Sequence, residues 1–427
     1  MEAAVDEMRT WDAVETAARI AAGDVTALEV IAASVARSVE ADPIIAAVAA
    51  PLYASARASA GHPVPGLLSG VPTAVKDMFA IEGAPLTHGS RAWRGNRATH
   101  TDRPAAQHLG TGLVPIAMST MSEMGFTPTT EPLGRPPTRN PWNQAHSSGG
   151  SSGGSAALVA AGVVPIAMAA DGGGSIRIPA AACGLVGLKP SKGRMALYGE
   201  AERLPIPVVA HGVVARSVRD VAAYHAAAEA HTPSPRGLEP IGHVTGPAAA
   251  RRRIGVTVEA PNAAPVDREI VAATRRTAEL LAAAGHEVIE LALPDPGSFA
   301  EDFTDYFGAL AMTTPVLGRK DLGRGFAPEL LDPWTRSMSA RGRRAAHRLP
   351  LVIHRLRAMA RRYEALFDDI DVMLTPTLTQ TAPVLGHLDV TLPHAVHLER
   401  LQQWMAFAPL HNAAGTPAIS VPAGLSG

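Results

Sequence analysis

The chain of 427 residues is 47% hydrophobic, and its 38 Lys and Arg against 39 Asp and Glu leave a net charge of -1. That length is ample for a large hydrophobic core. The balanced charge excludes an overall basic field for nucleic acid or an anionic membrane. The single cysteine, Cys183, excludes an internal disulfide and a cysteine-based zinc cluster.

The N-terminal segment MEAAVDEMRT is acidic and lacks the apolar stretch of a secretory signal. The apolar run that comes nearest to a membrane span, 156–170, is interrupted by Gly162 and Pro165. We therefore expect a cytoplasmic protein with neither a membrane nor a nucleic acid as partner.

The first sixty residues predict helices, with Asp12, Asp24 and Thr26 as candidate N-terminal caps. The pattern then predicts a strand at 71–79, a helix at 104–109, a strand at 112–118, a long loop at 125–154, a helix at 155–161 and a strand at 163–169. Loops as long as this one are usually functional in a compact enzyme.

The second half continues the alternation. It predicts a turn at 172–175, a helix at 176–182, an apolar segment at 185–188, a helix at 218–230, strands at 253–256 and 286–291 around a helix at 267–284, mostly helix at 297–370, and strands at 371–374 and 418–421. This order favours an α/β fold in which a mixed β-sheet core is covered by helices on both faces.

Two glycine- and serine-rich segments stand out, GGSSGGS at 149–155 and DGGGSIR at 171–177. The first is either a flexible linker or a backbone that bends sharply close to a ligand. Successive glycines before Ser175 place several N–H groups in one concavity, as in an oxyanion hole or a phosphate nest. Neither a P-loop nor a Rossmann fingerprint is present, which disfavours the phosphate.

A serine nucleophile needs a base, and no histidine stands in a recognisable hydrolase motif. Lys76 interrupts an apolar strand, where a lysine is costly unless its charge is satisfied. It is either the base or a lysine on an edge strand.

Taken together, these segments resemble the amidase signature family. The matching segments are VPTAVKD at 71–77, RNPWN at 139–143, GGSSGG at 149–154, DGGGSIR at 171–177, CGLVGLKP at 183–190, GVVARSVRD at 212–220, LTPT at 374–377 and GTPAISVPAG at 415–424. Ser151 and Ser175 stand 24 positions apart, as the family pattern requires. Within the family, the segments 123–125 and 129–132 resemble bacterial amidases related to 6-aminohexanoate cyclic dimer hydrolase.

The resemblance implies an amidohydrolase that cleaves linear carboxylic amides through an acyl-enzyme. It implies catalytic residues Lys76, Ser151 and Ser175, oxyanion-hole residues Gly172, Gly173 and Gly174, and substrate-binding residues Gly125, Gly149 and Gly150. Asp171, Arg177 and Ser152 are expected to stabilise the turns, and Cys183 to be packed. The expected substrate is a small-molecule amide, without a metal or organic cofactor, and a homodimer is left open.

The expected architecture is one amidase domain over 1–427, with an N-terminal helical region (1–65), a core (66–230), a helical substrate-side region (297–370) and late sheet strands (371–427). By this resemblance, the chain departs from the family at 117–120, carries extra residues at 134–139, and ends where members continue with a strand and a helix. We therefore expect the fold to lack that strand and helix and to leave a sheet edge open. Two alternatives remain, a glutamyl-tRNA amidotransferase A-type subunit and an inactive scaffold.

Overall fold

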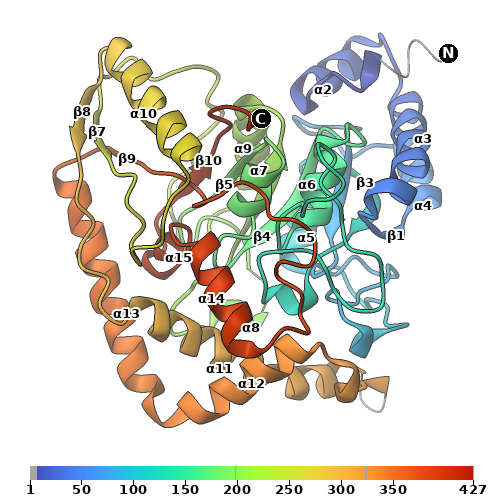
Figure 1. The fold of residues 1–427 in the computed structure, drawn as a ribbon. Coiled ribbons are helices and arrows are strands. Elements are labelled where there is room, and N and C mark those ends of the chain that lie inside the picture. The colour runs from blue at the N-terminus through green and yellow to red at the C-terminus, as the bar shows by residue number, and fades with distance from the viewer. Residues whose placement is uncertain (1–6, 198, 323–324, 427) are drawn as a thin grey trace.

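The computed structural model describes residues 7–197, 199–322 and 325–426. Its main sheet has seven strands in the order β1-β3-β2-β4-β6-β5-β10 (Figure 1). The strands are β1 (Val48–Pro51), β2 (Pro72–Lys76), β3 (Val114–Ser119), β4 (Ile166–Asp171), β5 (Val186–Lys189), β6 (Ala210–Ala215) and β10 (Ala418–Ser420). Strand β2 runs parallel to β3 and β4, whereas the other pairs are antiparallel. The predicted mixed sheet is confirmed.

A second sheet has three parallel strands in the order β8-β7-β9. Its strands are β7 (Arg253–Val256), β8 (Glu287–Glu290) and β9 (Val372–Leu374). Helix α10 (Arg268–Ala283) connects β7 to β8, which confirms the predicted βαβ unit. The sequence pattern did not reveal that these strands form a sheet of their own.

Helices cover both faces of the main sheet (Figure 1). Those of the N-terminal half are α2 (Ala13–Ala22), α3 (Ala27–Ile45), α4 (Tyr53–Ala60), α5 (Arg103–Leu109), α6 (Gly153–Ala160), α7 (Arg177–Ala182), α8 (Gly199–Glu202) and α9 (Val218–His231). Those that follow α10 are α11 (Phe299–Leu322), α12 (Pro333–Ala345), α13 (Leu349–Glu364), α14 (His394–Trp404) and α15 (Pro409–Ala414). None of the described helices combines the length and apolar character that a membrane span needs.

Two of the three predicted N-terminal caps are confirmed. The Asp12 side chain accepts a hydrogen bond from the N–H of Glu15, and Thr26 forms a reciprocal capping box with Glu29. Asp24 caps no helix, because α3 begins only after Thr26. The prediction of helices throughout the first sixty residues was also wrong, since β1 pairs antiparallel with β3 at the sheet edge. Its four residues are too few to show a strand period.

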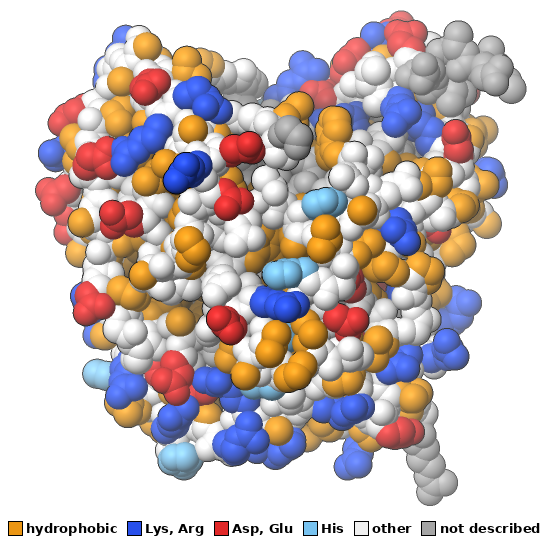
Figure 2. All heavy atoms as spheres, viewed as in Figure 1, with side chains coloured by type: hydrophobic (Ala, Val, Ile, Leu, Met, Phe, Trp, Pro, Cys, Tyr) orange, Lys and Arg blue, Asp and Glu red, His pale blue; other side chains and the backbone are white. Residues whose placement is uncertain are grey.

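The arginine-rich helices α12 and α13 place basic side chains along the lower edge of the molecule (Figure 2). Several of these arginines pair with carboxylates of α11. Arg341 Nε lies 2.7 Å from Asp305 Oδ1, and Arg355 Nη1 lies 3.5 Å from Asp302 Oδ1. These pairs locally neutralise the arginines, which is typical of a solvated helix face.

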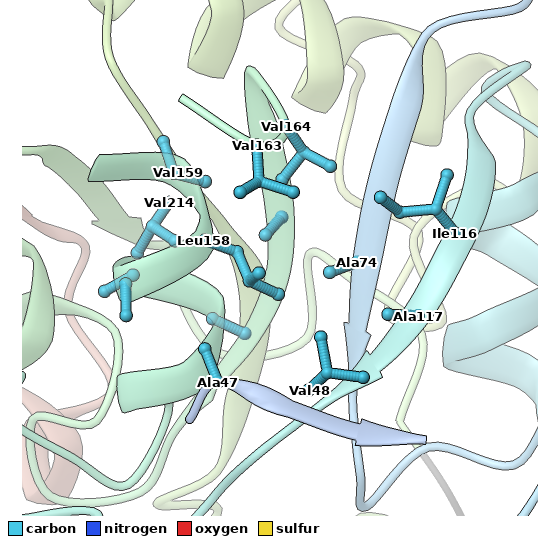
Figure 3. Close-up of a cluster of buried hydrophobic side chains, with 14 of the residues drawn as sticks. Ala47, Val48, Ala74, Ile116, Ala117, Leu158, Val159, Val163, Val164 and Val214 are labelled. Atoms are coloured by element: carbon cyan, nitrogen blue, oxygen red, sulfur yellow. The ribbon is translucent and has the colours of Figure 1, made fainter. Parts of the chain in front are cut away.

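The main core lies between the sheet and helices α3, α6 and α7 (Figure 3). Val214 of β6 and Leu158 of α6 belong to this cluster, whereas the adjacent Val213 packs with Val221 of α9 in a second cluster. Successive strand residues point to opposite faces, so a single strand supplies both layers. Buried on both sides, the sheet is a rigid platform for the side chains at its strand ends.

Candidate active site

The turn that carries Ser175 connects the end of β4 to the start of α7. Gly174 has a φ of 129°, which strongly favours glycine. A Cβ atom at Gly174 would lie 2.6 Å from Ile178 Cδ1 and 2.8 Å from Ala408 Cβ. The position therefore requires glycine both for its backbone conformation and for its packing. Ser175 keeps 8% of its surface exposed.

The Asp171 carboxylate holds this turn in shape by accepting hydrogen bonds from its backbone. Its Oδ1 accepts a hydrogen bond from Gly174 N–H at 2.7 Å, and its Oδ2 accepts one from Ile176 N–H at 3.2 Å. Arg177 Nε and Nη2 bind the same carboxylate at 2.9 and 3.0 Å. Burial alone would raise the pKa of Asp171, but the pairing with Arg177 outweighs it and holds that pKa well below its usual range. The expectation that both residues stabilise the turn agrees with this geometry.

Asn412 of α15 completes the network, and the sequence analysis missed it. Its Nδ2 donates to the backbone oxygen of Asp171 at 3.1 Å and to Oδ1 at 2.8 Å. Its Oδ1 accepts a hydrogen bond from Arg177 Nη2 at 2.6 Å. Asn412 is fully buried. It stands in a helix remote in sequence from the turn, so no local pattern indicated its role.

Lys76 ends strand β2 and is 1% exposed. Its Nζ donates to Ser151 Oγ at 2.7 Å and to Ser152 Oγ at 2.9 Å. Because β2 lies between β3 and β4, the interpretation of Lys76 as an edge-strand lysine was wrong. Burial lowers the pKa of Lys76 to about 7, against the opposing charge of Asp171. A neutral amine is therefore accessible near neutral pH.

Ser152 ties Lys76 to the neighbouring strand. The Ser152 hydroxyl accepts from Lys76 and donates to the Ala170 backbone oxygen at 3.2 Å. Ala170 immediately precedes Asp171, so this contact links the lysine to the strand that carries the turn. The geometry agrees with a structural role for Ser152.

Lys189 is a second buried lysine, and burial also lowers its pKa to about 7. Its Nζ donates to the backbone oxygen of Pro190 at 2.8 Å. Of these two lysines, Lys76 is the one that contacts a serine hydroxyl. A lowered pKa alone would not distinguish them, whereas their hydrogen bonds do.

The three glycines expected to bind substrate differ in their surroundings. A Cβ atom on Gly125 would lie 3.2 Å from Ser151 Oγ, so Gly125 adjoins the lysine–serine pair. One on Gly149 would lie 2.8 Å from Pro179 Cα, and one on Gly150 would lie 2.7 Å from the Thr129 backbone. A side chain at Gly149 or Gly150 would therefore collide with protein, so both positions are closely packed, and their role in substrate binding stays a prediction.

The turn amides are not equivalent. Gly174 N–H is already bonded to Asp171, whereas the N–H groups of Gly172, Gly173 and Ser175 have no acceptor within the described part of the chain. Among the described residues the Ser175 hydroxyl is hydrogen-bonded to no group, Ser151 included, whose Oγ is bound by Lys76 Nζ. Of the three glycines predicted for the oxyanion hole, Gly174 is thus the one whose amide serves the turn itself.

Three other features of the described residues were candidates for a separate centre: a large cleft, a metal site and Cys183. A cleft of about 1900 Å³ lies beside α10, β9 and β10, and its lining includes Arg177 and His411 but not Ser175. Within the ranges the structure describes, no three His, Cys, Asp or Glu side chains are grouped as a metal site would need. Cys183 is fully buried, and burial raises the pKa of its thiol to about 12, as expected for a packed residue.

The structure thus places a glycine-rich serine turn and a buried lysine–serine pair at neighbouring strand ends of one mixed sheet. The chain belongs to the amidase signature family, since the family described as Amidase matches residues 29–427. It is an amidase-family hydrolase that acts on amides.

Similar proteins agree with this assignment. The chain is 43% identical to the Mycobacterium tuberculosis protein named "Putative amidase AmiC" over 98% of this chain and 88% of that one. It is 31% identical to the 6-aminohexanoate-cyclic-dimer hydrolase of Paenarthrobacter ureafaciens over 97% of this chain and 88% of that one. A solved structure of 6-aminohexanoate cyclic dimer hydrolase complexed with substrate superimposes with a TM-score of 0.87 at 30% identity, covering 97% and 90% of the two chains.

Proposed function

We propose that the chain hydrolyses a carboxylic amide through an acyl-enzyme on Ser175, with Ser151 and Lys76 as the proton relay. The observation that carries this proposal is the 2.7 Å hydrogen bond from Lys76 Nζ to Ser151 Oγ inside a buried site. A lysine whose pKa is lowered to about 7 accepts a proton near neutral pH, as a solvated lysine does not.

In the acylation step, neutral Lys76 takes the proton of Ser151, and Ser151 takes the proton of Ser175. Ser175 Oγ bonds to the amide carbon, and the π electrons of the carbonyl move to its oxygen. When the tetrahedral intermediate collapses, the C–N bond breaks and Ser151 returns a proton to the leaving nitrogen. Water then attacks the ester, with the relay accepting its proton, and releases the carboxylate and free Ser175.

The carbonyl oxygen becomes an anion in this step and needs preorganised donors. We assign that role to the N–H groups of Gly172, Gly173 and Ser175. Gly174 N–H supports them indirectly, because its hydrogen bond to Asp171 holds the turn in shape. The anion is thus stabilised by backbone dipoles, and the chain's own groups supply each proton transfer.

The proposed substrate is a small linear amide. One relative is named for the hydrolysis of the 6-aminohexanoate cyclic dimer. That cyclic dimer is therefore the substrate with which linear amides should be compared. A panel of linear primary amides, anilides and the cyclic dimer would separate the two classes by kcat/KM. A preference for the cyclic dimer would contradict the linear assignment but not the nucleophile.

The direct test of the mechanism is labelling by a fluorophosphonate followed by peptide mass spectrometry. We expect the label on Ser175, and no label or amide hydrolysis in Ser175→Ala. Ser34→Ala is a matched control, because it also removes a buried hydroxyl, one that donates to the Val163 backbone oxygen at 2.6 Å. Full hydrolysis by a folded Ser175→Ala variant would overturn the proposal.

A further inference from the structure

Three apolar side chains from remote segments cover the turn that precedes Ser175. A Cβ atom on Gly173 would lie 3.4 Å from Met405 Cε, 3.5 Å from Phe303 Cε1 and 3.6 Å from Phe307 Cζ. One on Gly172 would lie 3.5 Å from Phe307 Cζ. We call Phe303, Phe307 and Met405 the apolar cover. It faces the same two glycines whose amides the proposed function assigns to the oxyanion.

The cover is built from two helices. Phe303 and Phe307 stand four residues apart on α11, so they share one helix face, and their ring centroids are 4.8 Å apart. Met405 follows directly after α14. Phe303 is buried, but Phe307, Met405 and Gly172 are partly exposed. The cover is therefore not sealed completely in the core.

The two carboxylates of α11 that are closest in sequence to Phe303 and Phe307, those of Asp302 and Asp305, are already paired. Asp302 accepts from Ser298 Oγ and pairs with Arg355, and Asp305 binds Arg341 and Arg348. Their carboxylates are thus engaged by Ser298, directly before α11, by an arginine from each of α12 and α13, and by Arg348 between these two helices. Gly125 adjoins Ser151, and the next residue, Phe126, packs on the same cluster as Phe307. This flank of the turn is therefore apolar, and the charged side chains of the turn itself, Asp171 and Arg177, are paired with each other.

We propose that the apolar cover binds the acyl part of the substrate and restricts this enzyme to amides of uncharged aliphatic or aromatic acids. This inference rests on the proposed function, because it takes Ser175 as the acylated residue. Aromatic rings and a flexible thioether offer dispersion contacts to hydrocarbon and no partner for a charge. A charged acyl group, such as that of glutamine, would lose its hydration there without compensation.

The test measures how fast fluorophosphonates with alkyl chains of increasing length label Ser175, since labelling requires no knowledge of the natural substrate. Ser175 Oγ forms a bond to phosphorus, fluoride leaves, and the relay takes the proton. We expect the second-order rate to rise roughly fourfold per methylene over the first few carbons. A chain ending in a carboxylate should react at least about tenfold more slowly than its methyl-ended counterpart.

Phe307→Ala should flatten this dependence on chain length, and Met405→Ala should weaken it. If the Phe307→Ala variant does not fold, the same measurement is made on Phe307→Leu. Phe299→Ala is the matched control, because its ring stacks on Phe303 at 5.6 Å but is not among the atoms nearest the turn glycines. It should keep the wild-type dependence.

Equal rates for all chain lengths, or an unchanged dependence in a folded Phe307→Leu variant, would overturn the inference while leaving Ser175 as the nucleophile. Preferred hydrolysis of glutamine over an apolar amide of equal length would overturn it too. If no probe labels Ser175, the proposed function itself fails, and this inference fails with it. The two failures are therefore distinguishable.

Discussion

Asn412 and Asp171 are 241 positions apart, yet Asn412 Nδ2 lies 2.8 Å from Asp171 Oδ1. Through this contact, helix α15 supports the turn that presents Ser175. The same carboxylate binds Arg177 and the backbone of the turn. A buried network of this kind is rigid when every member is satisfied and costly when one is removed.

Replacing Asn412 by alanine should therefore impair both stability and the reactivity of Ser175. The loss removes one of the donors to the buried Asp171 carboxylate and the side-chain donor to the Val208 backbone oxygen, at a cost of about 1–3 kcal/mol in the free energy of unfolding. Urea unfolding and the rate of fluorophosphonate labelling would measure the two effects. Gln403→Ala, at an exposed amide nearby, should change neither.

The lysine relay predicts a specific pH profile. Protonated Lys76 cannot accept a proton, so kcat/KM should be low at acidic pH, rise with an inflection near pH 7 and level off above it. Lys76→Ala should reduce the rate by several orders of magnitude. Lys76→Arg should not restore it, because a guanidinium stays protonated.

Lys189→Met is the control for this profile, because Lys189 is also buried but contacts no serine hydroxyl. The rising limb should persist in this variant. An active Lys76→Arg enzyme with an unchanged profile would show that the base is another group, even if Ser175 remains the nucleophile.

The two turn glycines Gly174 and Gly172 should respond differently to alanine. Gly174→Ala combines a φ of 129° with contacts under 3.0 Å and should cost about 1–3 kcal/mol or more of stability together with most of the activity. Gly172→Ala, whose Cβ would sit 3.5 Å from Phe307, should fold like the wild type. The melting temperatures of the Gly174→Ala and Gly172→Ala variants, measured by thermal unfolding, test this difference. Equal melting temperatures would contradict the strain assigned to Gly174.

Asp220 should make the stability depend on pH. Burial raises its pKa to about 6 despite hydrogen bonds from the Ala13 and Val14 backbone, so the folded chain holds this proton more tightly than the unfolded chain. Its contribution is present below about pH 4 and is lost as pH rises through 6, by about 3 kcal/mol in all. Asp220→Asn should flatten this dependence in urea unfolding between pH 4 and 7. Glu279→Gln, at an exposed position, should preserve it.

Much of the fold and the candidate site could be predicted from local sequence. The strand 253–256, the helix that follows it and the strand near 287 are short-range patterns, and so is the glycine run before Ser175. Lys76, Ser151 and Ser175 were assigned together through the resemblance to the amidase signature family, because each stands in one of its motifs. Strand β1 was missed because four residues carry too little periodicity to compete with the helices around them.

By itself, the sequence determined which residue types are available for chemistry and where the backbone must turn, because glycine, proline and alternating apolar residues act over a few positions. Only the tertiary structure decided that Lys76 is buried between two strands, that Asp171 occupies the Gly174 amide, and that Asn412, Phe307 and Met405 meet the turn. Burial and long-range contacts depend on how the layers pack, and it is desolvation by that packing that lowers the pKa of Lys76.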